Sequence, residues 1–258
     1  MRIAMINASP KLMIRKQDTS ASYVLLQDLR RQLRREHIHD FEDFHVKTGN
    51  LDQETFDALL KCDVWVFSFP IYAGGLPSHL LSFLTELDRK MAGLSPEEKV
   101  RAAGERAEDP DGGSAADSVG PSVGGTAPGA ADDSRSGDIL VYAIGNGGLF
   151  EGNEAYPAFR MIALWCGACR LSWCGGLGVG GGPAHIRQHV SQIALGQRRS
   201  YNRRLNDFAE AIAKGIPTLN TNCSPDMTRQ AYVLRRGRHY RAVARENGMV
   251  IAEISQRG

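Results

Sequence analysis

The segment CDVWVFSFPIYAGGLPSHLLSFL, residues 62–84, decides the fold of this chain. Residues 64–69 are almost continuously apolar, which is typical of a strand that is buried on both faces of a parallel sheet. The regular pattern then stops at residues 70–77, which contain two prolines and two adjacent glycines, and a helical apolar pattern follows over 77–91. Loops at the carboxyl ends of such strands bind ligands in open α/β sheets, and glycine allows close approach to the backbone. We therefore predict a ligand site at residues 70–77.

The alternation of strand and helix patterns continues along the chain. Each of five predicted strands is followed by a predicted helix, which favours a doubly wound, five-stranded parallel sheet with helices on both faces. The weakest strand pattern, at residues 38–46, is interrupted by acidic residues and suits an edge of the sheet. The predicted strands are 2–7, 38–46, 64–69, 139–144 and 171–179, and the predicted helices are 20–36, 51–60, 77–91, 153–169 and 200–214.

Two segments depart from this alternation. Residues 101–137 contain no leucine, isoleucine, methionine or aromatic residue, so they cannot bury enough apolar surface to fold. We predict a disordered insertion at about 95–137 within a domain that spans residues 1–220. Residues 221–258 form a basic extension with at least one amphipathic helix. Its arginines are interpreted as a solvated surface, with a site for the 2′-phosphate of NADPH or an acidic partner as the second interpretation.

The composition excludes several classes of protein. The chain has 31 basic and 29 acidic residues, a net charge of +2, so it has no general attraction for nucleic acid or a membrane surface. Its apolar runs are shorter than the roughly 18 residues of a membrane span. The five cysteines are scattered, which indicates reduced thiols rather than a disulfide framework. We expect a cytoplasmic protein with no nucleic acid and no membrane as partners.

The first loop after a predicted strand, NASPKLMIRKQDTSAS at residues 7–22, is rich in hydroxyl groups. Together with a lysine and the positive end of the following helix, these hydroxyls favour a phosphate site. The same residues also suit a plain helix N-cap. The loop lacks the glycine patterns of nucleotide hydrolases and dinucleotide-binding folds, so a monophosphate fits better than a pyrophosphate.

A third loop, GNGGLFEGNEA at residues 145–155, is again glycine-rich and again lies between a strand and a helix. Glycine and proline alone could explain both glycine loops as simple strand-to-helix turns. In a parallel sheet, however, all three loops meet at one edge. Bare backbone beside a phosphate pocket suits a planar ring with a phosphorylated tail.

These motifs resemble those of the NADPH-dependent FMN reductase family of the flavodoxin-like superfamily. The resemblance is carried by INASPK, SAS, SFPIYAGGLPSHLLSFL, GGLFEG and WCGACRLSWCGGLGVGGG, and it departs from the family at Ala8, where glycine is usual. It implies that FMN is bound through its phosphate by Ser9, Lys11, Ser20 and Ser22, and through its ring by Pro70, Ile71, Tyr72, Gly74, Gly75, Gly147, Gly148 and Phe150.

The resemblance also implies an activity. Hydride would pass from NADPH or NADH to FMN, and electrons would pass on to a small-molecule acceptor such as a flavin, a quinone or a nitroaromatic compound. Backbone N–H groups of Gly147 and Gly148 would stabilise charge on the reduced ring, so no catalytic side chain is assigned. We expect a homodimer or homotetramer.

Three alternatives remain at this stage. One is a non-enzymatic electron carrier of the flavodoxin type, although such carriers are usually strongly acidic. Another is a flavin-free interaction protein that keeps the fold. The third is an iron–sulfur flavoprotein that uses Cys166, Cys169 and Cys174, with Cys223 far downstream, but the helix and strand positions of the first three are typical of core thiols. We assign no metal ligand, and His185 and His189 are interpreted as surface residues.

Overall fold

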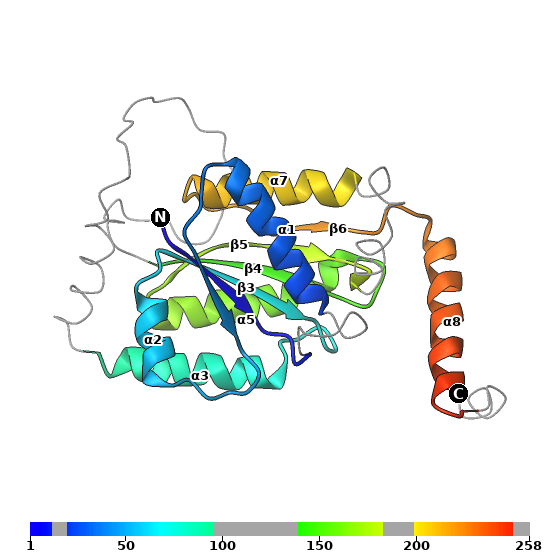
Figure 1. Ribbon diagram of the computed structural model, residues 1–258, viewed down its shortest axis with the longest axis horizontal. Coiled ribbons are helices and arrows are strands. Elements are labelled where there is room, and N and C mark those ends of the chain that lie inside the picture. Colours follow the sequence, from blue (N-terminus) through cyan, green and yellow to red (C-terminus); the bar gives the residue numbers. More distant parts are fainter. Residues whose placement is uncertain (12–19, 95–138, 183–198, 250–258) are drawn as a thin grey trace.

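The structure is a computed structural model that describes residues 1–11, 20–94, 139–182 and 199–249. A central sheet lies between two layers of helices, and one further helix stands beyond the carboxyl edge of the sheet (Figure 1). The predicted insertion at about 95–137, together with His185 and His189, lies outside the described residues.

The sheet has six strands in the order β2-β1-β3-β4-β5-β6, and every neighbouring pair is parallel. The order 2-1-3-4-5 is that of flavodoxin-like doubly wound sheets. The chain therefore has the predicted flavodoxin-like α/β fold. The strands are β1 Ile3–Asn7, β2 Phe41–His45, β3 Val64–Pro70, β4 Leu140–Asn146, β5 Ser172–Val179 and β6 Thr221–Cys223.

All five predicted strands are present, and β2 lies at an edge as its acidic residues indicated. The sixth strand was not predicted, because three residues with the sequence TNC carry no periodic apolar pattern. It pairs with β5 from Leu177 to Val179. The segment 221–258, which the sequence assigned to a helical extension, thus contributes a strand to the sheet before its helix begins.

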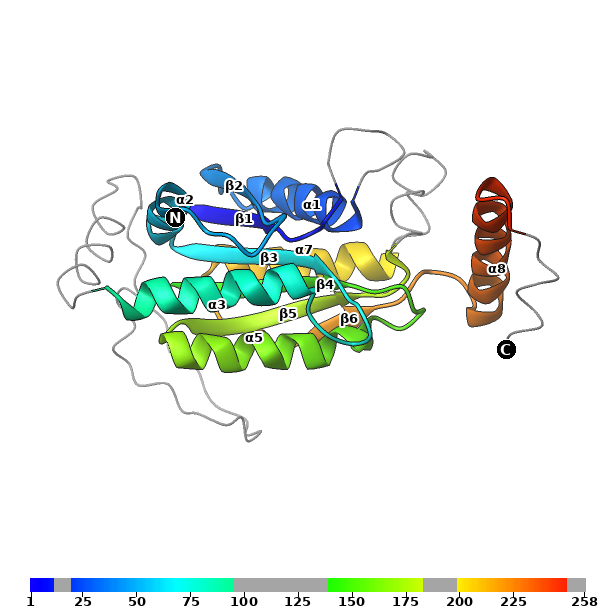
Figure 2. The same ribbon diagram turned by 90° about the horizontal axis from the view of Figure 1, so that it is seen from below.

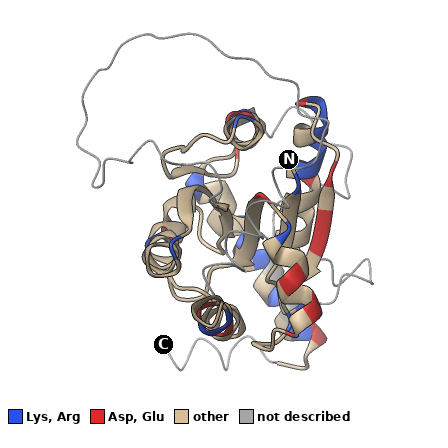
Figure 3. Cartoon of the chain, turned by 90° about the vertical axis from the view of Figure 1, so that its left-hand side faces the viewer, with Lys and Arg blue, Asp and Glu red and all other residues tan. Residues whose placement is uncertain are grey.

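The helices cover both faces of the sheet (Figure 2). On one face, α1 and α7 bury residues such as Leu25 and Tyr201 against the strands, and on the other α2, α3 and α5 bury residues such as Phe56, Leu80 and Phe159. Basic and acidic residues are interspersed over the helices (Figure 3), in keeping with the small net charge. The helices are α1 Ala21–Arg35, α2 Gln53–Leu60, α3 Ser78–Ala92, η1 Gly152–Ala155 (a 3₁₀ turn), α5 Tyr156–Cys169, α7 Arg199–Ala213 and α8 Arg229–Glu246.

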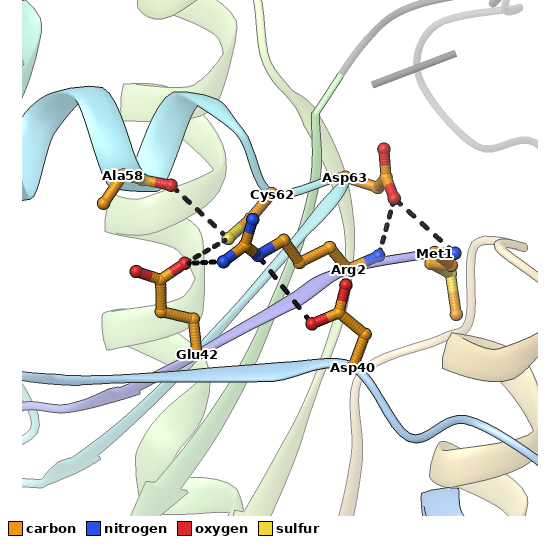
Figure 4. A network of polar contacts seen from close by, with 7 residues as sticks. All are labelled: Met1, Arg2, Asp40, Glu42, Ala58, Cys62 and Asp63. Carbon is orange, nitrogen blue, oxygen red and sulfur yellow. Dashed lines mark hydrogen bonds and ion pairs between the residues drawn. The ribbon is translucent and has the colours of Figure 1, made fainter. Parts of the chain in front are cut away.

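A polar network at the amino ends of the strands connects β1, β2 and β3 (Figure 4). The Arg2 guanidinium lies 2.9 Å from the Glu42 carboxylate and 3.8 Å from that of Asp40. The Arg2 backbone N–H donates to the Asp63 carboxylate at 2.7 Å. The network holds the starts of β1, β2 and β3 together, at the opposite edge from the predicted ligand site.

Cys62 belongs to the same network, and its thiol donates to the Ala58 carbonyl at 3.6 Å and to the Glu42 carboxylate at 3.9 Å. Burial, and next the Glu42 charge, raise the pKa of this thiol to about 12. Because the thiolate is the nucleophile, we expect iodoacetamide to leave Cys62 unmodified in the native protein at pH 8 and to modify it in denaturant. Peptide mass spectrometry measures both. Rapid native alkylation would contradict the buried position.

The raised pKa also sets a direction for stability at high pH. The thiol prefers its protonated form more strongly in the folded chain than in the unfolded chain, where its pKa is close to 9.0. Its contribution to the free energy of unfolding is therefore complete below pH 9 and is lost as the pH rises toward 12.

Candidate functional site

The two glycine loops that the sequence singled out meet at one cavity of about 660 Å³. One wall comes from the loop after β3 and the other from the loop between β4 and α5. The Ile71 N–H donates to the Asn146 carbonyl at 2.8 Å and ties the two loops together at their bases. The lining residues are Ile71, Ala73, Gly74, Gly148, Leu149, Asn153, Glu154, Pro157 and Arg236.

The loop after β3 ends in a tight turn. Tyr72 and Gly75 exchange backbone hydrogen bonds of 3.3 and 2.9 Å, and between them Ala73 and Gly74 have φ values of 49° and 77°. Two consecutive positive φ values are the pattern of a type I′ turn. A Cβ atom on Gly74 would meet nothing within 4 Å, so the backbone angle, and not crowding by the chain, favours glycine there.

The loop after β4 is held by its own contacts. The Gly147 N–H donates to the Val179 carbonyl at 2.9 Å, so it is used within the sheet and is not available to a ligand. The Leu149 N–H donates to the Glu154 carboxylate at 3.2 Å. Of the two N–H groups expected to stabilise charge on a ring, that of Gly148 has no acceptor within the described residues.

Glu154 is a cavity residue that the sequence analysis missed. Its carboxylate lies over Gly147, where a Cβ atom would be 1.1 Å from Glu154 Oε1. Burial raises the pKa of Glu154, while the hydrogen bond from Leu149 opposes the rise. The signal available in the sequence was an acidic residue just before a helix, which is too common to indicate a role.

In the predicted phosphate loop, Ser9 and Ser20 are both buried, and Ser20 is the N-cap of α1. Ser20 Oγ accepts the Tyr23 N–H at 3.2 Å, which leaves the hydroxyl hydrogen available for donation. Ser9 Oγ accepts the Lys11 N–H at 3.3 Å. The Lys11 residue is exposed and precedes the segment 12–19, which lies outside the described residues, so its role at a phosphate stays a prediction.

Ser22 has a structural role at this edge. Its Oγ accepts from the Asn146 amide at 2.8 Å, and its carbonyl accepts from the Ser68 hydroxyl at 3.0 Å. The Asn146 amide also donates to the Phe69 carbonyl at 2.8 Å. These buried bonds fix the start of α1 to the ends of β3 and β4. Phosphate binding is thus not needed to explain why residue 22 is a serine, and its predicted contact with a phosphate stays a prediction.

Asn7, the last residue of β1, is a candidate that sequence reasoning did not select. It is only 3% exposed, and its Oδ1 accepts the Ser9 N–H at 3.2 Å. Its Nδ2 has no hydrogen-bond partner among the residues that the structure describes. An unpaired buried donor costs roughly 1–3 kcal/mol, so this amide is well suited to an anion held by the loop.

The basic extension reaches the site through one face of α8. The Tyr232 hydroxyl donates to the Gly148 carbonyl at 2.6 Å, and its ring centroid lies 5.5 Å from that of Phe150. Arg229 lies 3.3 Å from the Glu151 carboxylate. Phe150 therefore packs on α8, while four other predicted ring contacts border the cavity without lining it: Pro70, Tyr72, Gly75 and Gly147.

The cysteines are separated by the sheet. Cys166 belongs to the core on the α5 side, and Cys174 belongs to the core on the α1 side. Within the described residues, no group of three or more histidine, cysteine, aspartate or glutamate side chains could hold a metal ion.

No helix in that part of the chain is long and apolar enough to cross a membrane.

Comparisons with solved structures give distant likenesses. The Trp repressor binding protein from Bacillus subtilis is 13% identical, with a TM-score of 0.43, over 74% of this chain and 99% of that one. A flavodoxin, WrbA-like protein from Agrobacterium tumefaciens is 10% identical, with a TM-score of 0.45, over 83% and 99%. An FMN-dependent NADH-azoreductase from Bacillus anthracis, solved with FMN, is 10% identical, with a TM-score of 0.45, over 83% and 100%.

No protein-family model and no curated protein sequence matches the chain. The conclusion that the fold is flavodoxin-like therefore rests on the parallel strand order 2-1-3-4-5, which the chain itself shows.

Proposed function

We propose that the chain binds FMN at the carboxyl edge of its sheet and transfers electrons from NADPH or NADH to a small-molecule acceptor. One observation carries this proposal: the loops after β3 and β4 wall a single cavity with glycine backbone. In sheets with this strand order, FMN binds at the carboxyl ends of β1 and β3, the neighbouring strands at which the strand order reverses. Two of the motifs that resemble the FMN reductase family, SFPIYAGGLPSHLLSFL and GGLFEG, include these loops.

The residues present fit both parts of the cofactor. The unpaired Asn7 amide and the Ser9 hydroxyl lie at the end of β1, and the Ser20 hydroxyl lies at the N-cap of α1, a helix end whose first N–H groups have no intrahelical acceptor. These are donors for a phosphate. Gly74 and Gly148 offer flat backbone to a ring.

When bound, FMN would supply the hydride and electron chemistry, and the chain would bind, orient and shield it. The apolar side chains of Ile71 and Leu149 in the cavity wall would exclude water from the reacting face.

A direct experiment separates this proposal from its alternatives. The purified protein is incubated with FMN, freed of unbound flavin and mixed with NADPH or NADH without oxygen. We expect a yellow protein that loses its colour when NADPH or NADH is added. The colour should return when a quinone, a nitroaromatic compound or free flavin is added. A yellow protein that neither nucleotide bleaches would be an electron carrier, and a colourless one would overturn the proposal. Light scattering measures the proposed homodimer or homotetramer.

The phosphate assignment gives a prediction about FMN against riboflavin. Asn7→Asp keeps the acceptor for the Ser9 N–H but replaces the unpaired amide with a negative oxygen. We expect FMN affinity to fall roughly tenfold or more, because a charge-assisted bond is lost and repulsion is added. Riboflavin affinity, measured by fluorescence quenching, should change little.

A second variant tests the same loop without adding charge. Lys11→Ala combined with Ser20→Gly removes two predicted donors, and glycine is chosen because it caps a helix nearly as well as serine. Equal losses for FMN and riboflavin in either variant would contradict the phosphate assignment.

A further inference from the structure

Helix α8 brings an arginine to the cavity from the far end of the chain. Arg229, Tyr232, Arg236 and Tyr240 recur at helical spacing and share one face of α8. Tyr232 and Arg229 fix this face to the loop after β4, through Gly148 and Glu151. Arg236, one turn further on, lines the cavity, and one of its guanidinium nitrogens lies 3.3 Å from where a Cβ of Gly148 would be.

The Arg236 guanidinium is held in place without being neutralised. It lies over the Tyr232 ring at 5.9 Å and over the Tyr240 ring at 4.7 Å, and it donates to the Tyr240 hydroxyl. No carboxylate in the described part of the chain lies within 4.0 Å of it, whereas Arg229 on the same face is paired with Glu151. Because a guanidinium has five N–H donors, Arg236 keeps donors for a ligand.

The one carboxylate that lines the described cavity, Glu154, is engaged elsewhere. It accepts the Leu149 N–H and lies over Gly147; burial raises its pKa, and the Leu149 hydrogen bond and, more weakly, the Arg236 charge oppose the rise. The cavity therefore has a positive group on the α8 side, and its lining carboxylate makes a hydrogen bond to the Leu149 N–H and no ion pair with Arg236 within 4.0 Å among the described residues.

The remaining walls suit an aromatic body. Gly74 and Gly148 are assigned to the FMN ring, and the other residues that line the cavity with Arg236 include the apolar Ile71, Leu149 and Pro157. An apolar slot with a single oriented guanidinium at its side matches a planar ring that carries a carboxylate.

We propose that Arg236 is the specificity-determining residue of this site and selects planar aromatic acceptors that bear an anionic group over neutral acceptors of the same shape. This inference deepens the proposed function and rests on it. The arginine contributes a charge-assisted, two-point contact to the carboxylate, and its guanidinium lies beside the Tyr232 and Tyr240 rings.

The test uses 4-nitrobenzoate and 4-nitrobenzamide, which share size and shape but differ in charge. Their dissociation constants are measured by calorimetry on the FMN-loaded protein, and their reduction is measured with NADPH as donor. We expect the wild type to bind 4-nitrobenzoate more tightly than 4-nitrobenzamide. Arg236→Gln should weaken 4-nitrobenzoate binding roughly tenfold, while 4-nitrobenzamide binding changes little. Arg236→Lys should restore part of the preference.

The matched control is Arg238→Gln, which removes the same charge from an exposed position of the same helix that does not line the cavity. It should leave the preference unchanged. Equal losses for both ligands in Arg236→Gln, or no loss, would overturn the proposal. A selective rise in the KM for NADPH with acceptor binding intact would also overturn it, because the arginine would then serve the donor.

These outcomes are distinguishable from failure of the proposed function. If the protein retains no FMN, the proposed reductase activity fails, but calorimetry with benzoate and benzamide on the flavin-free chain still measures whether Arg236 discriminates charge. If FMN is bound and reduced normally while no preference exists, only the inference about Arg236 fails.

Discussion

Gly178→Ala is expected to lower the stability of the folded chain substantially. A Cβ atom at Gly178 would lie 2.1 Å from the Gly152 carbonyl oxygen, and one at Gly152 would lie 2.4 Å from the Gly178 carbonyl oxygen. Strand β5 and η1 thus touch backbone to backbone. Because neither carbonyl can rotate away as a side chain would, η1 must move.

We expect the free energy of unfolding to fall by about 1–3 kcal/mol, the usual cost of overpacking a core. For a domain of this size that corresponds to a fall in melting temperature of roughly 2–4 °C for each kcal/mol. FMN affinity, measured well below the melting temperature, should fall as well, because η1 follows directly on the loop that carries Gly148 and Leu149.

Gly167→Ala is the matched control, since a Cβ atom there would meet nothing within 4 Å and its φ is ordinary. It lies within α5, where alanine is favoured over glycine by roughly 0.5–1 kcal/mol, so its melting temperature should rise slightly. A Gly178→Ala protein as stable as the wild type would show that β5 and η1 do not pack as described.

The contrast between these glycines shows that the sequence could not predict which glycines serve packing and which face a ligand. The run WCGGLGVGGG at residues 173–182 contributed to the resemblance to flavin reductases. In the structure, much of it has a packing reason instead: Gly178 approaches Gly152, and a Cβ at Gly180 would lie 2.1 Å from the Phe150 carbonyl oxygen. A glycine needed for contact, one needed for a positive φ and one that faces a ligand look identical in a sequence.

The fold was predictable because its signal is local. The apolar run at 64–69 and the helical spacing after residue 77 each depend on neighbours in the chain, and the alternation of such patterns dictates a parallel sheet. The two glycine loops could be placed at one edge for the same reason.

Contacts between distant residues carry no such signal. The Asn146 amide binds Ser22 across 124 positions, and the Tyr232 hydroxyl binds Gly148 across 84. The basic helix was interpreted mainly as a solvated surface, which fits the exposed Arg238 but not Arg236, which lines the cavity. Which arginine faces the site depends on how α8 packs on the loop after β4, through the contacts of Tyr232 with Gly148 and of Arg229 with Glu151.

Loss of bound flavin is the expected result of enlarging Gly74. Gly74 lines the cavity, so a valine there adds bulk to its wall, and we expect a folded Gly74→Val protein that is colourless or weakly yellow. Valine also strains the backbone, because the φ of 77° costs a branched residue more than glycine. Flavin loss in this variant alone could therefore come from a distorted turn.

Gly74→Asn separates the two causes. Asparagine tolerates the left-handed region far better than valine, and nothing in the chain lies within 4 Å of the new Cβ, so the turn should survive. If a flat ring lies against this backbone, the asparagine variant melts near the wild-type temperature yet loses most of its FMN. If residues 72–75 are only a turn between β3 and α3, it keeps its FMN, and valine costs stability alone. The ratio of flavin to protein absorbance, measured beside the melting temperature of both variants, decides whether the ring contacts Gly74.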